Sequence, residues 1–303
     1  MNIAAILALA MLLDAALGEP QWLWRRLPHP AVLMGRAIDA LDRRLNYGAM
    51  RRTRGAAALI ILCAGAGAAG ILITQLGSIA VIVASAILIA QRSLIDHVAA
   101  VASALREGTA PGRAAVAMIV GRDTTAMEPA DIARAAIESA AENFSDGVIA
   151  PLFWLCVGGL PGLAIYKAVN TADSMIGHRT PRHEAFGWAA ARLDDGLNLI
   201  PARLSALLIA VLARPRPSWG DIAREALQHR SPNAGWPEAA MARSLGVALS
   251  GPRAYNGRMQ DYPLVNPGGM RMPGPAQIDA AVAVLWRAWA AVLAGSSVAA
   301  FLL

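Results

Sequence analysis

The chain has 303 residues, of which 56% are hydrophobic and 16% charged, and its mean hydropathy is +0.45. Soluble domains carry about a quarter charged residues, so this composition excludes an ordinary soluble enzyme and indicates an integral membrane protein. The net charge is +6, and Lys167 is the only lysine. Cys63 and Cys156 both lie in apolar runs without metal-site spacing, which favours packing roles over a zinc site or a disulfide.

Arginine residues flank the apolar runs. Residues 19–55 hold eight Arg and three acidic residues, residues 214–281 hold eight Arg and five acidic residues, and residues 92–148 hold five Arg and eight acidic residues. The positive-inside rule then places 19–55 and 214–281 in the cytoplasm. No lysine-rich run resembles a nucleic-acid-binding patch, so the sequence predicts no nucleic-acid partner.

The apolar segments predict the membrane helices. Residues 1–18 lack the basic start of a signal peptide, because no Arg or Lys precedes Arg25, and we expect a retained short membrane helix. Residues 56–91 are apolar except near 74–78, which predicts a hairpin of two spans, 56–73 and 77–91. Two further apolar segments cover 200–213 and 280–303, the second interrupted by Arg287, which either snorkels or faces protein.

The apolar segment 149–168 contains Pro151 and then GGLPG, which interrupt regular helical hydrogen bonding. Either 149–168 and 200–213 both cross the membrane or neither does, and in both cases 92–148 and 214–279 lie on one side. The side of residues 169–199 therefore stays open, and 149–168 is a possible re-entrant segment broken at 158–162. The sequence therefore predicts an all-α, multi-pass protein with about 4–6 membrane helices.

We expect one membrane-embedded domain over residues 1–303, with helical cytoplasmic loops at 19–55, 92–148 and 214–279. Apolar residues at helical spacing between residues 34 and 45 predict an amphipathic helix. Pro111 and Pro129 are placed to begin helices, the second running to about Phe144. No alternating strand pattern stands out, and the Gly- and Pro-rich residues 251–277 indicate an ordered loop or a lid.

A first polar cluster follows the helix predicted from Pro129. Glu138 and Glu142 lie one helical turn apart, and Asn143 and Asp146 follow them. Such a carboxylate pair can hold a hard cation, so Glu138, Glu142 and Asp146 are candidate metal ligands and Asn143 a candidate substrate contact. The alternative is that Glu138 pairs with Arg134 while Glu142 faces water.

A second cluster adjoins the apolar segment 149–168, where polar groups are costly unless they bind something or one another. It contains Lys167, Asn170, Asp173, Ser174, His178 and Arg179. A compact ammonium in a chain that otherwise uses arginine favours a specific role for Lys167, with snorkelling to the interface as the alternative.

A third cluster holds Arg192, Asp194, Asp195, Asn198 and Arg203. Adjacent aspartates followed by an asparagine are typical of Mg²⁺ or metal-phosphate sites, although the pattern is short. Helix capping or an ion pair with Arg192 is the alternative.

Several isolated residues complete the candidates for substrate or phosphate binding. They are Arg122, Asp123 and Thr124 in the GRDT motif, His29 between two prolines, and Asn233 and Trp236 in SPNAGWPEAA. The chain contains no P-loop, no dinucleotide-binding glycine motif, no HExxH and no GxSxG, so a bound nucleotide would need a site of another kind.

Together these segments resemble the CobD/CbiB family of cobalamin biosynthesis, the adenosylcobinamide-phosphate synthases. The resemblance runs in order through LDAALGEP, PHPAVLMGRAI, GRDT, residues 133–179, FGWAAARLDDGLNLIPARL and SPNAGWPEAAMARSLGVALSGPRAYNG. It covers nearly the whole chain apart from the apolar spans. At Glu19 the family often has Asp, a change that keeps the carboxylate.

The resemblance implies a multi-pass inner-membrane enzyme whose active site faces the cytoplasm. It implies that ATP activates the propionate carboxylate of the corrinoid adenosylcobyric acid for amide formation with aminopropanol or its O-phosphate. Such a ligase needs Mg²⁺ against the phosphate charge, Arg or Lys for the phosphates, and a base for the incoming ammonium. Lys167, Asp173, His178, Asp194 and Asp195 are the candidate catalytic residues. Membrane lipid and other late cobalamin-pathway enzymes are the further partners it suggests.

Two other classes remain open at this point. A membrane prenyl- or alcohol-phosphotransferase would also use Asp-rich Mg²⁺ motifs, but it should show a second motif of the same kind. A non-catalytic sensor or scaffold such as the AmpE proteins would keep the spans without needing Lys167, Asp173 and the adjacent aspartates together. The amine donor, the division of the carboxylates between metal and substrate, and the oligomeric state do not follow from the sequence.

Overall fold

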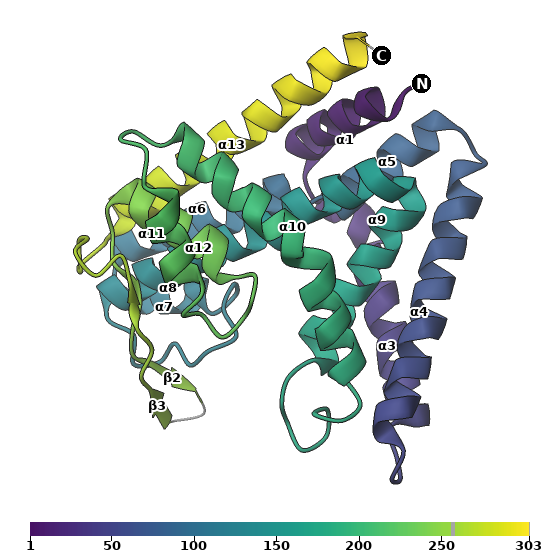
Figure 1. Cartoon of the computed structure of the whole chain (residues 1–303), viewed down its shortest axis with the longest axis horizontal. Helices are drawn as coiled ribbons and strands as arrows, with labels where there is room; N and C mark the ends of the chain where they lie inside the picture. The colour runs from purple at the N-terminus through teal and green to yellow at the C-terminus, as the bar shows by residue number, and fades with distance from the viewer. Residues whose placement is uncertain (256–257, 303) are drawn as a thin grey trace. The chain divides into compact units, whose positions relative to one another are not determined.

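The computed structural model of the chain describes residues 1–255 and 258–302 (Figure 1). Asn256 and Gly257 of the GPRAYNG motif and Leu303 of the segment 280–303 lie outside the described residues. Within these described residues, five helical stretches are long and apolar enough to cross a membrane: Arg51–Thr74, Ser78–Glu107, Pro129–Ile176, Trp188–Leu212 and Pro275–Leu302. A shorter apolar helix covers Ile3–Leu17. The expected all-α, multi-pass membrane protein is therefore confirmed.

The chain divides into two compact units. The first unit comprises Met1–Ala90, Asp146–Leu199 and the C-terminal residues from Gly295. Its helices are α1 (Ile3–Leu17), α2 (Gln21–Trp24), α3 (Pro30–Leu45), α4 (Arg51–Thr74), α5 (Ser78–Leu88), α9 (Ala150–Ile176) and the first half of α10 (Trp188–Leu212). A short π-helix, η1 (Ser145–Ile149), precedes α9.

The second unit comprises Gln91–Ser145 and Ile200–Ala294. It contains α6 (Gln91–Glu107), α7 (Thr109–Val116), α8 (Pro129–Phe144), α11 (Trp219–Ala226), α12 (Gly235–Leu245), most of α13 (Pro275–Leu302), and the strands β1 (Leu249–Ser250), β2 (Arg253–Tyr255), β3 (Arg258–Gln260) and β4 (Leu264–Val265). The helices expected at 34–45 and from Pro111 and Pro129 are present, and α8 ends at Phe144.

A helical hairpin is present in the first unit at the turn predicted near residues 74–78, and the two spans 56–73 and 77–91 stay a prediction. α4 ends at Thr74 and α5 begins at Ser78, and the two helices are in contact. Gly77 in the turn has φ +96°, a left-handed conformation that a residue with a Cβ rarely adopts. The break in the apolar run near 74–78 therefore marks the turn.

The break predicted within GGLPG is also confirmed. Gly159 in α9 has φ 59° and ψ −159°, outside the helical region, and Pro161 follows it. α9 is therefore two helical pieces joined at a kink. Whether the piece before the kink crosses the bilayer or re-enters it stays a prediction.

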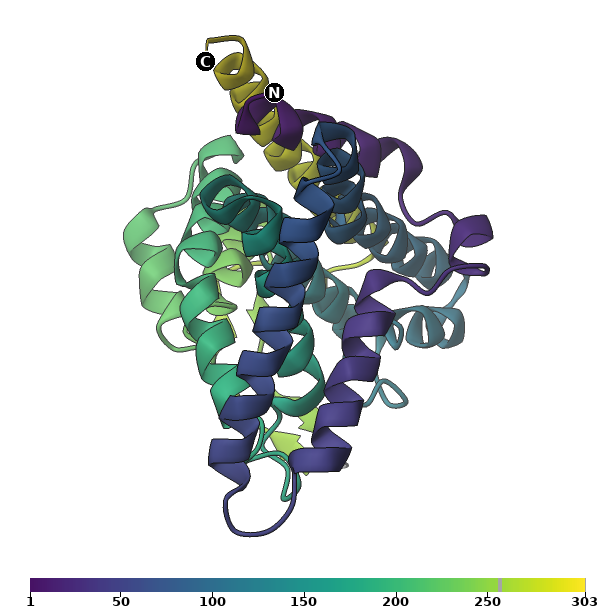
Figure 2. The same ribbon diagram turned by 90° about the vertical axis from the view of Figure 1, so that its right-hand side faces the viewer.

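α4 packs closely against α9 because glycine removes the side chain at the closest approach. A Cβ on Gly70 would lie 2.6 Å from the Cα of Pro161. A Cβ on Gly55 would lie 1.9 Å from the carbonyl oxygen of Phe186, in the loop after α9. α3 runs beside α4 and also contacts α9 (Figure 2).

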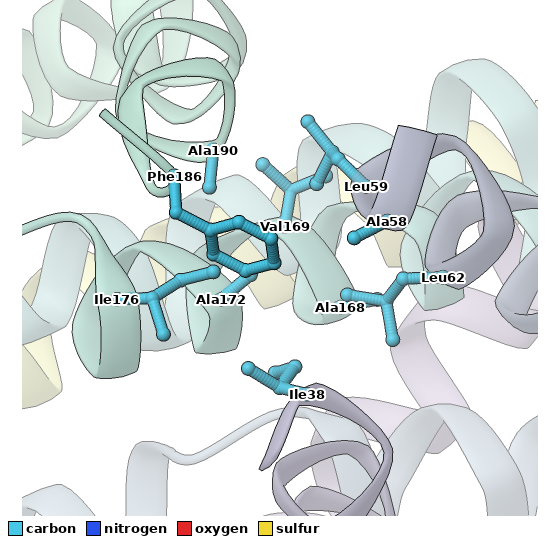
Figure 3. Close-up of a cluster of buried hydrophobic side chains, with 10 residues drawn as sticks. All are labelled: Ile38, Ala58, Leu59, Leu62, Ala168, Val169, Ala172, Ile176, Phe186 and Ala190. Carbon is cyan, nitrogen blue, oxygen red and sulfur yellow. The ribbon is translucent and has the colours of Figure 1, made fainter. Parts of the chain in front are cut away.

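An apolar core fills the space between these helices and α10. It consists of Ile38, Ala58, Leu59, Leu62, Ala168, Val169, Ala172, Ile176, Phe186 and Ala190. The Phe186 ring, 1% exposed, points into this cluster beside Ile176 and Ala172 (Figure 3). Its burial holds the loop 177–187 against α4 and fixes how α9 turns into α10.

In the second unit, α8 contacts α6, α7, α12 and β1. β1 pairs antiparallel with β4, and β2 pairs antiparallel with β3. The sequence did not predict these strands, because two or three residues are too few to show an alternating pattern. The region expected to be an ordered loop or lid thus contains two small hairpin-like sheets. Arg287 on α13 is exposed and donates to the carbonyl of Ala283 on its own helix.

Candidate functional site

α9 and the first half of α10 bring the second and third polar clusters together in the first unit. Asn170 Nδ2 donates to Asp194 Oδ1 at 3.2 Å. Asn198 Nδ2 donates to Asp194 Oδ2 at 3.0 Å and to the Asp194 carbonyl at 3.2 Å. Asp194 is 8% exposed, and each of its carboxylate oxygens accepts from an amide. This arrangement fixes the orientation of one carboxylate between two membrane helices.

Tyr166 completes this network, and the sequence reasoning missed it. Its hydroxyl lies 3.0 Å from Asn198 Oδ1 and 2.9 Å from the carbonyl oxygen of Asp146 in η1. Because the Asn198 oxygen faces the tyrosine hydroxyl, the Asn198 amide nitrogen must face Asp194. The signal was available, since a tyrosine inside an apolar span needs a partner for its hydroxyl.

Two more carboxylates lie near Asp194. Asp173 and Asp195 are close enough to interact electrostatically with its charge. Arg192 Nη1 lies 3.9 Å from Asp195 Oδ2, and the Arg192 side chain is 65% exposed, so this ion pair is weak. Among the described residues no group of three or more His, Cys, Asp or Glu side chains forms a metal-ligand set. The acidic residues can still serve Mg²⁺, which often takes one or two carboxylates together with water and substrate phosphates.

Lys167 lies on α9, half-buried. Its ammonium interacts electrostatically with the carboxylates of Asp146 and Glu19. His29 is a further electrostatic neighbour of Glu19 and Lys167. The first unit thus gathers an amine, an imidazole and two carboxylates from four different segments.

His29 is held in a defined orientation. Its Nδ1 accepts from the backbone N–H of Ala31 at 3.2 Å, which caps α3, and its ring lies edge-on to Trp24. Burial lowers the pKa of His29, and the nearby carboxylate of Glu19 offsets part of that effect. The lowered pKa favours a neutral imidazole at physiological pH.

The remaining residues of the second cluster are exposed. Ser174 donates to the Asn170 carbonyl at 3.0 Å, and His178 and Arg179 lie in the loop 177–187. These side chains are accessible at the end of the α9–α10 pair, which suits contacts to a large substrate.

The loop that carries His178 and Arg179 is anchored to α3 through Asp42. The buried carboxylate of Asp42 forms an ion pair with Arg182 and accepts from Asn46 Nδ2 at 2.7 Å. His183 Nε2 lies 3.6 Å from the same carboxylate. Burial alone would raise the pKa of Asp42, but hydrogen bonds from Arg182 and Asn46 and the nearby charges hold that pKa below its ordinary value.

The first polar cluster is divided between the units: Glu138, Glu142 and Asn143 lie in the second unit, whereas Asp146 lies in the first. Arg122 Nη2 donates to Glu138 Oε2 at 2.7 Å, with both side chains about nine-tenths buried. The backbone N–H of Ser250 donates to Glu138 Oε1, also at 2.7 Å. Glu138 therefore connects the GRDT segment, α8 and β1. The alternative prediction, that Glu138 pairs with Arg134, was wrong, because Arg134 pairs with Asp131 on its own helix.

The other candidates of the second unit differ in exposure. Glu142 and Asn143 are exposed, and Asn143 Nδ2 donates to the Ser139 carbonyl at 2.9 Å. Asp123 Oδ1 accepts from the backbone N–H and hydroxyl of Thr125, and these bonds lower the pKa of Asp123. Thr124, the neighbouring candidate, is half-buried.

Asn233 and Trp236 are buried beside Arg203. Arg203 Nη1 approaches Asn233 Oδ1 at 3.5 Å, and its guanidinium lies 4.6 Å from the centre of the Trp236 ring. Trp219 contacts the same ring at 5.4 Å between ring centres. These contacts give the SPNAGWPEAA segment a structural role in the second unit. Its proposed substrate contacts stay a prediction.

The fold and this buried polar network define a class, the polytopic helical membrane proteins that hold a polar site between their spans. The family model described as CobD/Cbib protein matches residues 7–285. This chain belongs to that family.

Curated relatives agree over nearly the full length. The chain is 50% identical to "Cobalamin biosynthesis protein CobD" of Rhizobium meliloti over 307 aligned positions, covering 95% of this chain and 94% of the relative. It is 47% identical to the Sinorhizobium fredii protein of the same name, covering 98% and 97% of the two chains. For the Rhodobacter capsulatus protein of that name the identity is 48%, with 96% and 95% covered. No solved structure matches the chain.

Proposed function

We propose that this protein forms an amide bond in cobalamin biosynthesis, joining the amino group of aminopropanol or its O-phosphate to the propionate carboxylate of adenosylcobyric acid. The product is adenosylcobinamide or its phosphate. Membership of the CobD/CbiB family over residues 7–285 carries the proposal. The buried carboxylate network between α9 and α10 supports it, because a membrane packing role alone does not require those polar groups.

The chemistry requires activation of the carboxylate, which is unreactive toward amines in water. In the proposed sequence the propionate oxygen attacks the γ-phosphorus of ATP, giving an acyl phosphate and ADP. The amine nitrogen then attacks the acyl carbon, phosphate leaves with the C–O bond electrons, and a base takes the ammonium proton. Mg²⁺, when bound, offsets the charge of the transferring phosphate.

The residues of the first unit have the chemical types that these steps need. Lys167, Arg179 and Arg192 offer positive charge for phosphate oxygens. Asp173 and Asp195 offer oxygen ligands that suit Mg²⁺ or the incoming ammonium. Asp194, whose orientation is fixed by two amides, offers a third carboxylate near Asp173 and Asp195. Because Nδ1 of the neutral His29 imidazole accepts from the Ala31 N–H, its Nε2–H is a hydrogen-bond donor.

We place the protein in the bacterial inner membrane with this site facing the cytoplasm. ATP and the corrinoid are cytoplasmic, and the arginine-rich residues 19–55 precede the first long span. The corrinoid, aminopropanol phosphate and membrane lipid are the proposed partners.

Reconstitution tests the function directly. Purified protein in detergent receives adenosylcobyric acid, aminopropanol phosphate, ATP and Mg²⁺, and mass spectrometry follows the amide product and ADP. We expect product only with all four components. Asp195→Asn should lose on the order of 10²-fold in turnover, whereas Asp96→Asn, which alters an exposed pair with Arg92, should retain it. Amide formation without ATP, or none by a folded protein under any condition, would reject the proposal.

A further inference from the structure

An open pocket of about 240 Å³ lies in the first unit where α4 and α10 begin. It is lined by Arg51, Arg52, Pro181, Glu184, Ala185 and Trp188. None of these residues belongs to the polar site between α9 and α10. The pocket therefore needs an explanation of its own.

The two arginines give the pocket an anion-binding character. The Arg52 guanidinium lies 3.7 Å from the centre of the Trp188 ring, and Arg51 Nη1 donates to the Pro181 carbonyl at 3.1 Å. Within the part of the chain that the structure describes, neither arginine forms an ion pair with a carboxylate. A guanidinium stacked on an aromatic ring keeps its N–H edge available for a phosphate.

The position of the pocket along the chain points to a membrane surface. The candidate spans of α4 and α10 begin at Arg51 and Trp188, two residues that line the pocket. Beyond it α4 exposes large apolar side chains, with Ile60 68% and Ile61 55% exposed. Tryptophan and arginine at the end of a span are typical of the headgroup layer.

We propose that this pocket binds the headgroup of an anionic phospholipid that carries a hydroxyl group, such as phosphatidylglycerol. Arg51 and Arg52 take the phosphodiester, whose negative charge matches theirs. Glu184 offers an acceptor for a headgroup hydroxyl, which a choline headgroup lacks. The acyl chains lie along the exposed apolar face of α4. This inference does not depend on the proposed reaction.

A soluble phosphate compound shares the phosphate chemistry but lacks the acyl chains. The exposed apolar residues Ile60 and Ile61 follow Arg52 on the same helix by about two turns, so a lipid uses both features and the soluble compound only one. Lipid binding should therefore be stronger than binding of the matching headgroup compound.

The test is a native mass spectrometry titration of the delipidated, full-length protein in detergent. Its ligands are phosphatidylglycerol, phosphatidylcholine and sn-glycerol 3-phosphate. We expect the first to bind most tightly. The double variant Arg51→Gln/Arg52→Gln should weaken it at least tenfold, about 1.4 kcal/mol. The matched control Arg43→Gln/Arg44→Gln removes the same charge from exposed positions on α3 outside the pocket and should bind as wild type does.

Three results would overturn the assignment. They are equal binding of phosphatidylglycerol and phosphatidylcholine, equal binding of glycerol 3-phosphate, and equal loss in the control pair. If the double variant does not fold, Arg52→Gln alone decides, because it keeps the Arg51 bond to Pro181. That single variant must still weaken phosphatidylglycerol binding at least threefold, and unchanged binding would reject the site.

Discussion

Replacing Tyr166 with Phe is the sharpest perturbation of the polar network, because it removes one hydroxyl and keeps the buried ring. Tyr166 is 1% exposed, and Asn198 is fully buried. Its hydroxyl lies within hydrogen-bonding distance of both Asn198 Oδ1 and the Asp146 carbonyl. A buried acceptor that loses its donor costs about 1–3 kcal/mol. The free energy of unfolding should therefore fall by about that amount.

The same change should affect turnover through Asp194. Without the hydroxyl, the Asn198 amide is no longer held with its nitrogen toward Asp194, so one of the two amides that orient this carboxylate becomes free to turn. We expect kcat for amide formation to fall about tenfold or more, while KM changes little. Tyr166 touches no reacting atom in this account and acts as a positioning residue.

Melting temperature in detergent and steady-state kinetics should be measured on the same preparation. Tyr47→Phe is the matched control, because Tyr47 is 58% exposed, its ring stacks on Arg54, and its hydroxyl forms no hydrogen bond with the described residues. Wild-type melting temperature and wild-type kcat in Tyr166→Phe would refute the reasoning. A lowered melting temperature with unchanged kcat would show that the hydrogen bonds of Tyr166 contribute to stability but not to turnover.

Four further outcomes follow from particular contacts. Because the pKa of Asp42 is lowered in the folded protein, its contribution to stability is present above the unfolded pKa and is lost as pH falls through the folded pKa. Asp42→Asn lacks that contribution, so the midpoint of acid unfolding, followed by circular dichroism, should move to higher pH. An unchanged midpoint would contradict this. Gly70→Ala should lower the free energy of unfolding by about 1–3 kcal/mol, because the added Cβ would lie 2.6 Å from a backbone atom of α9. Gly65→Ala on the same helix should leave the free energy of unfolding unchanged, because open space surrounds Gly65. Lys167→Met should raise KM for ATP or aminopropanol phosphate at least tenfold, which corresponds to about 1.4 kcal/mol of binding free energy, and Lys167→Arg should restore little of it. Unchanged kinetics in Lys167→Met would instead support the alternative that Lys167 snorkels to the membrane interface. A cysteine at Thr180 should be protected from an impermeant reagent applied outside intact cells, and labelling there would place the site on the other face.

Most of the fold could be predicted because membrane spans depend on apolar length and a few punctuating residues. The turn near 74–78, the helix start at Pro129 and the kink at Gly159 all coincide with Gly or Pro in the sequence. The strands β1 to β4 could not be predicted, because a ladder of two or three residues depends on the partner strand rather than on a local pattern.

The polar site was predictable in its composition but not in its connections. A polar residue in an apolar run is costly alone, so the sequence indicates that Asn170, Asp194 and Asn198 have partners. Which partner each one has depends on how α9 and α10 face each other, and that follows from tertiary packing. The same limit explains Glu138, whose partner Arg122 lies sixteen residues away in sequence, beyond the reach of helical spacing rules that favoured Arg134.

Asp194 has two further carboxylates near it, and like charges raise the energy of a buried carboxylate. Asp194 lies within electrostatic reach of Asp173 and of Asp195, and the amides of Asn170 and Asn198 bring it hydrogen bonds but no positive charge. The weak pair between Arg192 and Asp195 offsets little of this repulsion. A structural role would be served better by neutral residues of similar size. A bound cation or a substrate ammonium would interact favourably with all three carboxylates, so this place between the helices suits a positively charged ligand whatever other contacts these side chains make.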